Sequence, residues 1–173
     1  HRRQRQMCIR DRLNPLPPAA VVAGNVETSQ AVTNALLLAM NIAAASQGTM
    51  NNLSFGNEHH QYYETLAGGT GAGPGFDGAD AVHSHMTNSR LTDVEILENR
   101  LPVEVVKFCE RLDSGGKGQY SGGNGLIRHL RFKENMTATL LSNHRISGPP
   151  GLERGENGKK GIGHIIGSNG DLE

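Results

Sequence analysis

The sequence predicts an α+β fold in which one long N-terminal helix is followed by a glycine-rich, mostly antiparallel β region. Two patterns lead to this prediction. Apolar side chains recur at helical spacing near the N-terminus. Beyond residue 66, where 20 of the 23 glycines lie, runs rich in β-branched residues alternate with glycine turns.

The helix is predicted over about residues 26–46. Asn25 is a suitable N-cap, and prolines within residues 14–18 indicate an extended connector before it. Apolar side chains follow at i, i+3, i+4, i+7, i+8 and i+11, namely at Val32, Ala35, Leu36, Ala39, Met40 and Ala43. We interpret this stripe as a core face without a chemical role.

The rest of the chain has the pattern of short strands and turns. Residues 47–57 indicate a loop that enters a short strand, and the capping-box form of residues 92–95 predicts a short helix over 93–99. Strands are expected at 103–112, 126–132 and 137–146, with hairpin connections at 114–118 and 121–125. Residues 155–173 are expected to form a glycine-rich loop or frayed end.

Composition excludes several classes of protein. Hydrophobic residues make up 36% of the 173 residues, and there is no Trp, so the core is expected to be lean. The mean hydropathy is −0.45 and no apolar run approaches the length of a transmembrane helix. Two cysteines are too few for a disulfide framework, which favours a reduced, cytoplasmic setting.

The first twelve residues differ from the rest in charge. They hold five Arg against one Asp, which leaves 12 basic and 16 acidic side chains in the remainder, a net charge of −4. The body of the chain therefore offers no electrostatic case for nucleic-acid binding. A basic nucleic-acid arm and a transit peptide are the alternatives for residues 1–12. We interpret the run instead as foreign to the protein, because it resembles a translated sequencing-adapter tail.

Seven blocks of residues resemble successive blocks of hydantoinase B/5-oxoprolinase proteins, in the order of that family. They span about residues 13–154, and their order and spacing are more specific than any one motif. The blocks are GNVETSQ at 24–30, ASQGTMNN at 45–52, YYETLAGG at 62–69, GAGPGFDG at 71–78, HMTN at 85–88, LTDVE at 91–95, and SGGKG at 114–118 followed by GGNGLIR at 122–128.

The resemblance implies that residues 13–154 are the C-terminal part of a hydantoinase B-type domain, a fragment of a larger subunit. It also implies a partner, a hydantoinase A-type subunit that binds ATP with Mg and phosphorylates the carbonyl oxygen of a cyclic amide such as a hydantoin or 5-oxoproline. We expect a hetero-oligomer, with no membrane or nucleic-acid partner, and we expect this chain alone to be inactive. The metal ligands of carboxylase relatives lie in the earlier part of the subunit, so any divalent metal is expected there.

Two alternatives remain open at this level. The subunit could belong instead to an ATP-dependent carboxylase of the acetone or acetophenone type, because the large subunits of these carboxylases resemble the same family. This region could also be an assembly module whose chemistry is carried elsewhere in the subunit.

The chemistry requires a general base for water and donors for a developing oxyanion. His85 is the first candidate base. His83 and His85 would lie on one side of a strand, where they could bind a metal as a pair or act as a base with its orienting partner. Two histidines alone favour the alternative that one or both are surface residues. Glu64 is a second candidate base, with a solvated carboxylate as the alternative, and the phenol of the adjacent Tyr63 is a candidate group for binding the substrate or phosphate. Asn88 is a candidate donor to an oxyanion or a residue that orients a substrate amide.

The glycine-rich loop 68–78 is a candidate phosphate or oxyanion cradle. Backbone N–H groups at Gly68, Gly69 and Gly71 could approach a phosphate closely, and a surface loop is the alternative. The GxGxxG form of residues 73–78 is rejected as a dinucleotide motif, because Pro74 lies within it and no strand or helix flanks it.

Three further residues are assigned no chemistry. Arg128 and Arg131 alternate with apolar residues and are expected to face solvent. Cys109 is expected to be a buried thiol rather than a nucleophile.

Overall fold

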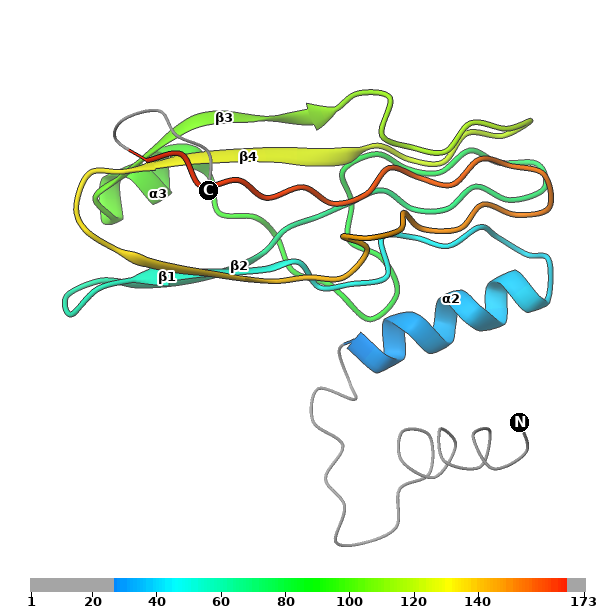
Figure 1. The fold of residues 1–173 in the computed structure, drawn as a ribbon, viewed down its shortest axis with the longest axis horizontal. Coiled ribbons are helices and arrows are strands. Elements are labelled where there is room, and N and C mark those ends of the chain that lie inside the picture. The colour runs from blue at the N-terminus through cyan, green and yellow to red at the C-terminus, as the bar shows by residue number, and fades with distance from the viewer. Residues whose placement is uncertain (1–26, 168–173) are drawn as a thin grey trace, which may run out of the picture.

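A computed structural model describes residues 27–167 and confirms the α+β class (Figure 1). Two helices and five strands follow one another along the described part of the chain, and all strand pairs are antiparallel. In chain order the elements are α2 (Ser29–Ala39), β1 (Asn52–Gly56), β2 (Gln61–Thr65), α3 (Val94–Arg100), β3 (Val103–Arg111), β4 (Gly125–Phe132) and β5 (Thr137–Leu141).

Helix α2 is shorter than predicted. It covers 11 residues and is capped at Met40, after which Asn41 takes a left-handed φ of 53° that ends the helical path. The extension to residue 46 is therefore wrong, because residues 43–48 belong to neither a helix nor a strand. The proposed N-cap at Asn25 lies outside the described residues.

The inward face of α2 is polar rather than apolar. Gln30 and Asn34 are its buried residues, whereas Leu36 and Met40 are each more than half exposed. The prediction of an apolar core stripe is thus wrong for the described structure. The physical reason is that α2 packs against hydroxyl, amide and imidazole groups of the 46–49 and 84–87 segments, which polar side chains can satisfy.

Two sheets enclose the apolar core. One sheet has the order β2-β1-β5 and the other is the pair β3-β4, and Figure 1 shows them as separate layers, with α3 at one end. Phe55 of β1 lies between them, with ring centroids 4.9 Å from Tyr62 and 5.1 Å from Phe132. Together with Leu97 and Val103 it forms the fully buried cluster.

Strand β3, strand β4 and helix α3 lie close to their predicted positions. The N-cap of α3 is Asp93, whose carboxylate accepts from the backbone N–H groups of Glu95 and Ile96, so the cap is one residue later than the capping-box pattern suggests. Strand β5 ends at Leu141, five residues before the predicted end. The motifs 114–118 and 121–125 both belong to the single connection between β3 and β4 rather than to two hairpins.

The glycine-rich segments pack against one another by backbone contact. Ala44 N–H donates to the Ala72 carbonyl, Gly123 N–H donates to that of Thr70, and Lys159 N–H donates to that of Ser114. Figure 1 shows these loops side by side at the end of the molecule away from α3. A Cβ at Gly69 would overlap the carbonyl of Gly123, so glycine is required for this close approach.

Within residues 27–167, no helix is long and apolar enough to span a membrane.

Candidate functional site

The segment that carries His83 and His85 is a turn and not a strand. Val82 forms an isolated bridge with Gly68, and the chain then turns so that Thr87 N–H donates to the Ser84 carbonyl at 3.1 Å. His85 has a φ of 56°, a left-handed conformation that is uncommon for a residue other than glycine. The predicted arrangement of two imidazoles on one side of a strand is therefore wrong, because strand alternation does not apply here.

A polar cluster of Asn34, Ser46, Ser84 and His85 joins this turn to helix α2. The side-chain oxygen of Asn34 accepts from Ser46 N–H at 3.1 Å and from the Ser46 hydroxyl at 3.2 Å. The Ser84 hydroxyl donates to Ser46 Oγ at 3.0 Å. His85 Nε2 lies 2.7 Å from Asn34 Oδ1 and 3.2 Å from Ser46 Oγ. We call these four residues the Asn34 cluster.

The hydrogen bonds of the Asn34 cluster determine the tautomer of His85. A backbone N–H can only donate, so the Asn34 atom that faces Ser46 N is the carbonyl oxygen. This oxygen can only accept, so His85 Nε2 carries the proton and donates to it. The lone pair of a neutral His85 then lies on Nδ1.

Burial lowers the pKa of His85 from its ordinary value of 6.5, so the ring is neutral at pH 7. The residue as a whole remains exposed even though Nε2 is turned into the cluster. A neutral histidine that is held through one nitrogen and keeps a lone pair on the other can take a proton from water.

Gln30 supports the turn from inside. Its side chain is completely buried, and Nε2 donates to the Ser84 carbonyl at 3.1 Å and to the Thr87 hydroxyl at 2.6 Å.

The ring of His83 differs from that of His85, because both ring nitrogens of His83 are buried and have no hydrogen-bond partner. Burial accordingly lowers the pKa of His83 below 6.5.

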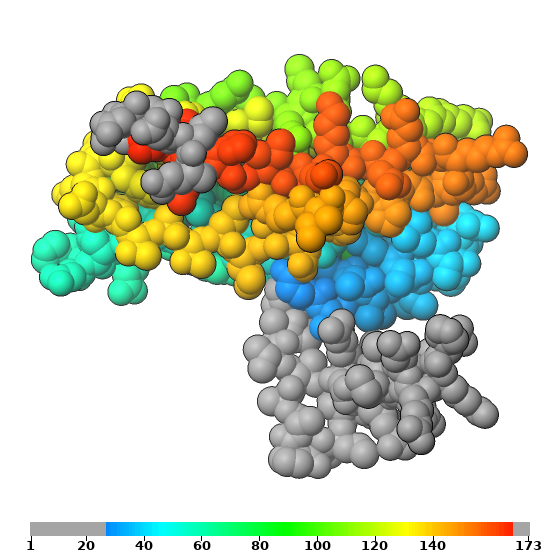
Figure 2. All heavy atoms as spheres, viewed as in Figure 1, coloured from blue at the N-terminus to red at the C-terminus, as the bar shows by residue number. Residues whose placement is uncertain are grey.

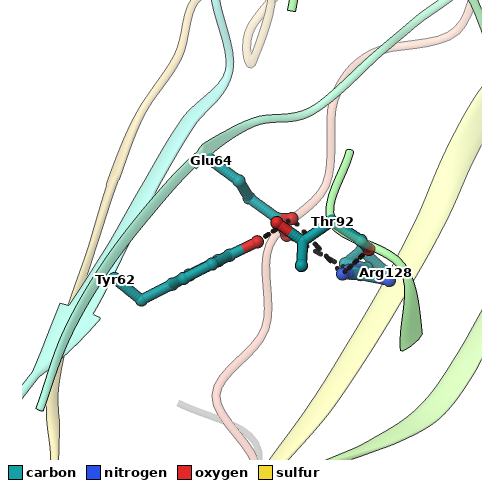
Figure 3. A network of polar contacts seen from close by, with 4 residues as sticks. All are labelled: Tyr62, Glu64, Thr92 and Arg128. Atoms are coloured by element: carbon teal, nitrogen blue, oxygen red, sulfur yellow. Dashed lines mark hydrogen bonds and ion pairs between the residues drawn. The ribbon is translucent and has the colours of Figure 1, made fainter. Parts of the chain in front are cut away.

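A second polar network lies between the two sheets (Figure 3). Glu64 of β2 forms an ion pair with Arg128 of β4, with 3.1 Å between Oε1 and Nε, and the side chains are only 2% and 1% exposed. The Tyr62 hydroxyl donates to Glu64 Oε2 at 2.8 Å, and Arg128 Nη2 donates to the Thr92 carbonyl at 3.3 Å. Arg128 also lies over the ring of Phe108, 4.6 Å from its centroid.

The prediction that Arg128 faces solvent is therefore wrong. The apolar alternation of β4 is imperfect, and β2 of the other sheet supplies a carboxylate that compensates the buried guanidinium. Arg131 does face solvent, as predicted, and pairs there with Glu104 at 2.9 Å. Tyr62 belongs to the same network as Arg128. Burial and, as a smaller cause, the nearby carboxylate of Glu64 raise the pKa of Tyr62 to about 12.

The structure separates the predicted partners Tyr63 and Glu64. Successive side chains of a strand point to opposite faces, so Glu64 meets Tyr62 and Arg128 while Tyr63 is 58% exposed. Tyr63 lines an open hollow of about 500 Å³ over β1, β2 and β5, together with Gln61 and Thr139.

The three glycines predicted to cradle a phosphate are packed against other loops. A Cβ would overlap the Gln47 side chain at Gly68, the Gly123 carbonyl at Gly69 and the Ala44 carbonyl at Gly71. The carbonyls of Gly68 and Gly69 accept from Val82 and Gln47. These contacts explain the glycines by packing, and their role toward a phosphate stays a prediction.

Asn88 and Cys109, the remaining predicted positions, both lie at the surface. Asn88 is exposed just beyond the buried Thr87. Cys109 is exposed, so the expectation of a buried thiol is wrong; it lies in the outer half of β3, where most side chains face solvent. Among the described residues, no group of three or more His, Cys, Asp or Glu is placed to hold a metal ion.

The sequence matches one known protein family over most of its length. The Hydantoinase B/oxoprolinase family matches residues 9–171. The chain belongs to this family.

Relatives in this family include proteins from several kingdoms. The chain is 52% identical over 158 residues to a protein named 5-oxoprolinase from Dictyostelium discoideum, and 48% identical over 154 residues to 5-oxoprolinase 1 from Arabidopsis thaliana. These alignments cover 91% and 89% of this chain but only 12% of each relative. A putative D-/L-hydantoinase subunit from Pseudomonas sp. is 26% identical over 86% of the chain and 26% of its own length. The chain is thus a fragment relative to the proteins it matches.

The family blocks contain residues whose importance the sequence did not reveal. Ser46 lies in the block at 45–52 and Arg128 ends the last block, yet neither was predicted as a site residue. Asn34 lies between blocks, and a polar residue one turn after Gln30 was the signal that could have identified the inward face of α2. No periodicity could have paired Asn34 with His85, which is 51 positions away.

Proposed function

We propose that this chain is part of an ATP-dependent enzyme that hydrolyses a cyclic amide, with hydantoin or 5-oxoproline as the substrate class. The observation that carries the proposal is the 52% identity to a protein named 5-oxoprolinase across nine-tenths of this chain. The name of the Pseudomonas relative, a subunit of a hydantoinase, supports the same class of substrate and a multisubunit enzyme.

The need for ATP follows from the chemistry of the bond. An amide nitrogen donates electron density into its carbonyl, so water attacks the carbonyl carbon slowly. Phosphorylation of the carbonyl oxygen suppresses this resonance, so that water can add to the carbon. The ring C–N bond then breaks as the ring nitrogen takes up a proton, and hydrolysis of the resulting acyl phosphate by a second water releases phosphate and the ring-opened acid. We assign the binding of ATP and Mg to an A-type partner subunit, since the chain contains no GxxxxGK[ST] motif.

Within this chain, the Asn34 cluster supports a role for His85 as the general base. Asn34 and Ser46 hold its Nε2–H, so that Nδ1 would accept the proton from the attacking water. Asn88, exposed three residues farther on, is proposed as a donor to the developing oxyanion. Glu64 is fully engaged by Arg128 and Tyr62, so we assign the base to His85 in preference to Glu64.

The experiment that tests the function uses the full-length protein together with its A-type partner. We expect phosphate release from ATP that depends on 5-oxoproline or hydantoin, proceeds without bicarbonate and yields the ring-opened acid. Consumption of a ketone that requires bicarbonate would replace this proposal with a carboxylase. If no cyclic amide stimulated phosphate release, the proposal would be rejected.

A further inference from the structure

A cluster of four cationic side chains lies at the surface near the end of strand β3. Arg111, Arg145, Lys159 and Lys160 line an open hollow of about 780 Å³, together with Ser147 and several glycines. No Asp or Glu lines it among the described residues. In Figure 2 the segment that contributes most of this hollow, residues 142–167 in orange and red, crosses the visible face beside the green β3–β4 connection. We call this feature the basic groove.

Hydrogen bonds hold the two arginines of the basic groove in place. Arg111 Nη1 donates to the carbonyl of Lys160 at 2.7 Å, and Arg145 Nε donates to the Ser142 hydroxyl at 2.8 Å. The glycine at position 163 lets the backbone pass beside the Arg145 guanidinium, since a Cβ there would come within 3.0 Å of Nη2. Each guanidinium is therefore oriented by a neutral partner and retains further N–H groups for a ligand.

None of the four cations of the basic groove forms an ion pair within the described residues. In residues 27–167 the ion pairs are Glu64–Arg128 and Glu104–Arg131, and neither includes a cation of the groove. Clustered positive charges repel one another, an arrangement that an anion would relieve. The clustering also runs against the composition, because beyond residue 12 acidic side chains outnumber basic ones by 16 to 12.

We propose that the basic groove binds a phosphate-class anion, either inorganic phosphate or the terminal phosphate of a nucleotide. Guanidinium groups match the geometry of phosphate oxygens with paired N–H donors, lysines add mobile positive charge, and glycine backbone allows close approach. This inference rests on charge and geometry alone and does not depend on the proposed hydrolysis of a cyclic amide.

The test is calorimetric titration of the full-length protein with inorganic phosphate and, separately, with ADP. Arg145→Met combined with Lys160→Met should weaken binding by about tenfold or more, because charge-assisted hydrogen bonds are removed. Arg131→Met, which removes an exposed arginine outside the groove, should leave the affinity unchanged. If the double variant binds phosphate more weakly but ADP as tightly as the wild type, the groove is a site for free phosphate. If the double variant binds both more weakly, the groove takes the phosphate of a nucleotide.

Two results would overturn the proposal. One is the absence of phosphate and ADP binding in the wild-type protein, which is expected if an acidic surface of the rest of the subunit fills the groove. The other is unchanged affinity in the double variant. If Arg145→Met prevents folding, Lys159→Met with Lys160→Met gives the same test, because both lysines are exposed and their side chains make no ion pair in the described chain. Binding is measured without turnover, so failure here is distinct from failure of the proposed function.

Discussion

At the scale of single residues, the structure distinguishes charges that stabilise the fold from groups that remain able to react. Glu64 and Arg128 belong to the first kind, because both are buried and each satisfies the other. We place His85 in the second kind, since Asn34 binds one ring nitrogen and the other keeps the lone pair that we propose as the base. The sequence indicated both Glu64 and His85 as candidate bases, and only the spatial neighbours separate them.

The Glu64–Arg128 pair predicts a large loss of stability when one partner is removed. Arg128→Met leaves a buried, unpaired carboxylate and should lower the free energy of unfolding by about 3–5 kcal/mol. Adding Glu64→Gln should recover part of that loss. The measurement is urea unfolding of the full-length protein, with Arg131→Met as a control that should cost less than about 1 kcal/mol. A loss in Arg128→Met no larger than the control would contradict a buried ion pair.

His83 predicts a dependence of stability on pH. Its pKa is below 6.5 in the folded state, so the unfolded chain takes up a proton first as the pH falls. The contribution of neutral His83 is therefore present above about pH 6.5 and is lost as the pH falls toward the lower folded pKa. We expect His83→Phe to flatten the decline in unfolding midpoint between about pH 7 and 5, measured on the full-length protein. An identical slope in the wild type and the variant would show that His83 does not titrate in this way.

At the scale of elements, local sequence was sufficient where short-range chemistry determines the structure. The capping-box pattern located α3 to within one residue, although the cap is Asp93 and lies one residue later than the pattern suggests. Strands β3 and β4 begin and end within one residue of their predicted limits. Helix α2 was misjudged because its apolar spacing implied an apolar neighbour. The residues that it contacts, Ser46, Ser84 and His85, come from distant loops, and no local pattern reveals that these loops are polar and packed against the helix.

The glycine-rich loops were recognised as loops, but their packing was not foreseen. Glycine spacing indicates turns, whereas the stacking of one loop on another depends on contacts between positions such as Gly69 and Gly123. The Gly68–Val82 bridge lies next to this contact, and the turn of His85 follows the bridge directly along the chain.

The close approach of Gly69 to Gly123 predicts that a single methyl group is destabilising. Gly69→Ala should lower the free energy of unfolding by about 1–3 kcal/mol, because the added carbon overlaps a backbone carbonyl. Gly125→Ala is the matched control, since its Cβ would lie 3.7 Å from the Ser114 hydroxyl oxygen, an ordinary contact. Equal stability of the two variants in chemical denaturation would contradict the packing described here.

At the scale of the whole molecule, the chain has little core of its own. Six apolar residues are buried in the described part, whereas seventeen large apolar residues there are exposed. The chain covers 12% of the 5-oxoprolinases to which it is similar, and we expect the rest of such a protein to cover part of this apolar surface.

This imbalance predicts that the chain expressed alone is inactive and only weakly folded. Residues 13–173 on their own should bind a hydrophobic dye strongly and turn over neither hydantoin nor 5-oxoproline, because apolar surface is uncovered and the proposed ATP-binding partner is absent from the assay. Dye fluorescence and phosphate release are the two measurements. Turnover by the isolated chain would show that the site is complete without a partner.

The central claim is that His85, held by Asn34, is the base that activates water against the activated carbonyl. The most direct measurement is the rate of phosphate release dependent on cyclic amide in the full-length complex carrying His85→Gln. We predict a fall of about 10²–10⁴-fold, with the complex intact and with His129→Gln, an exposed histidine of β4, at the wild-type rate. A wild-type rate in His85→Gln would contradict the account.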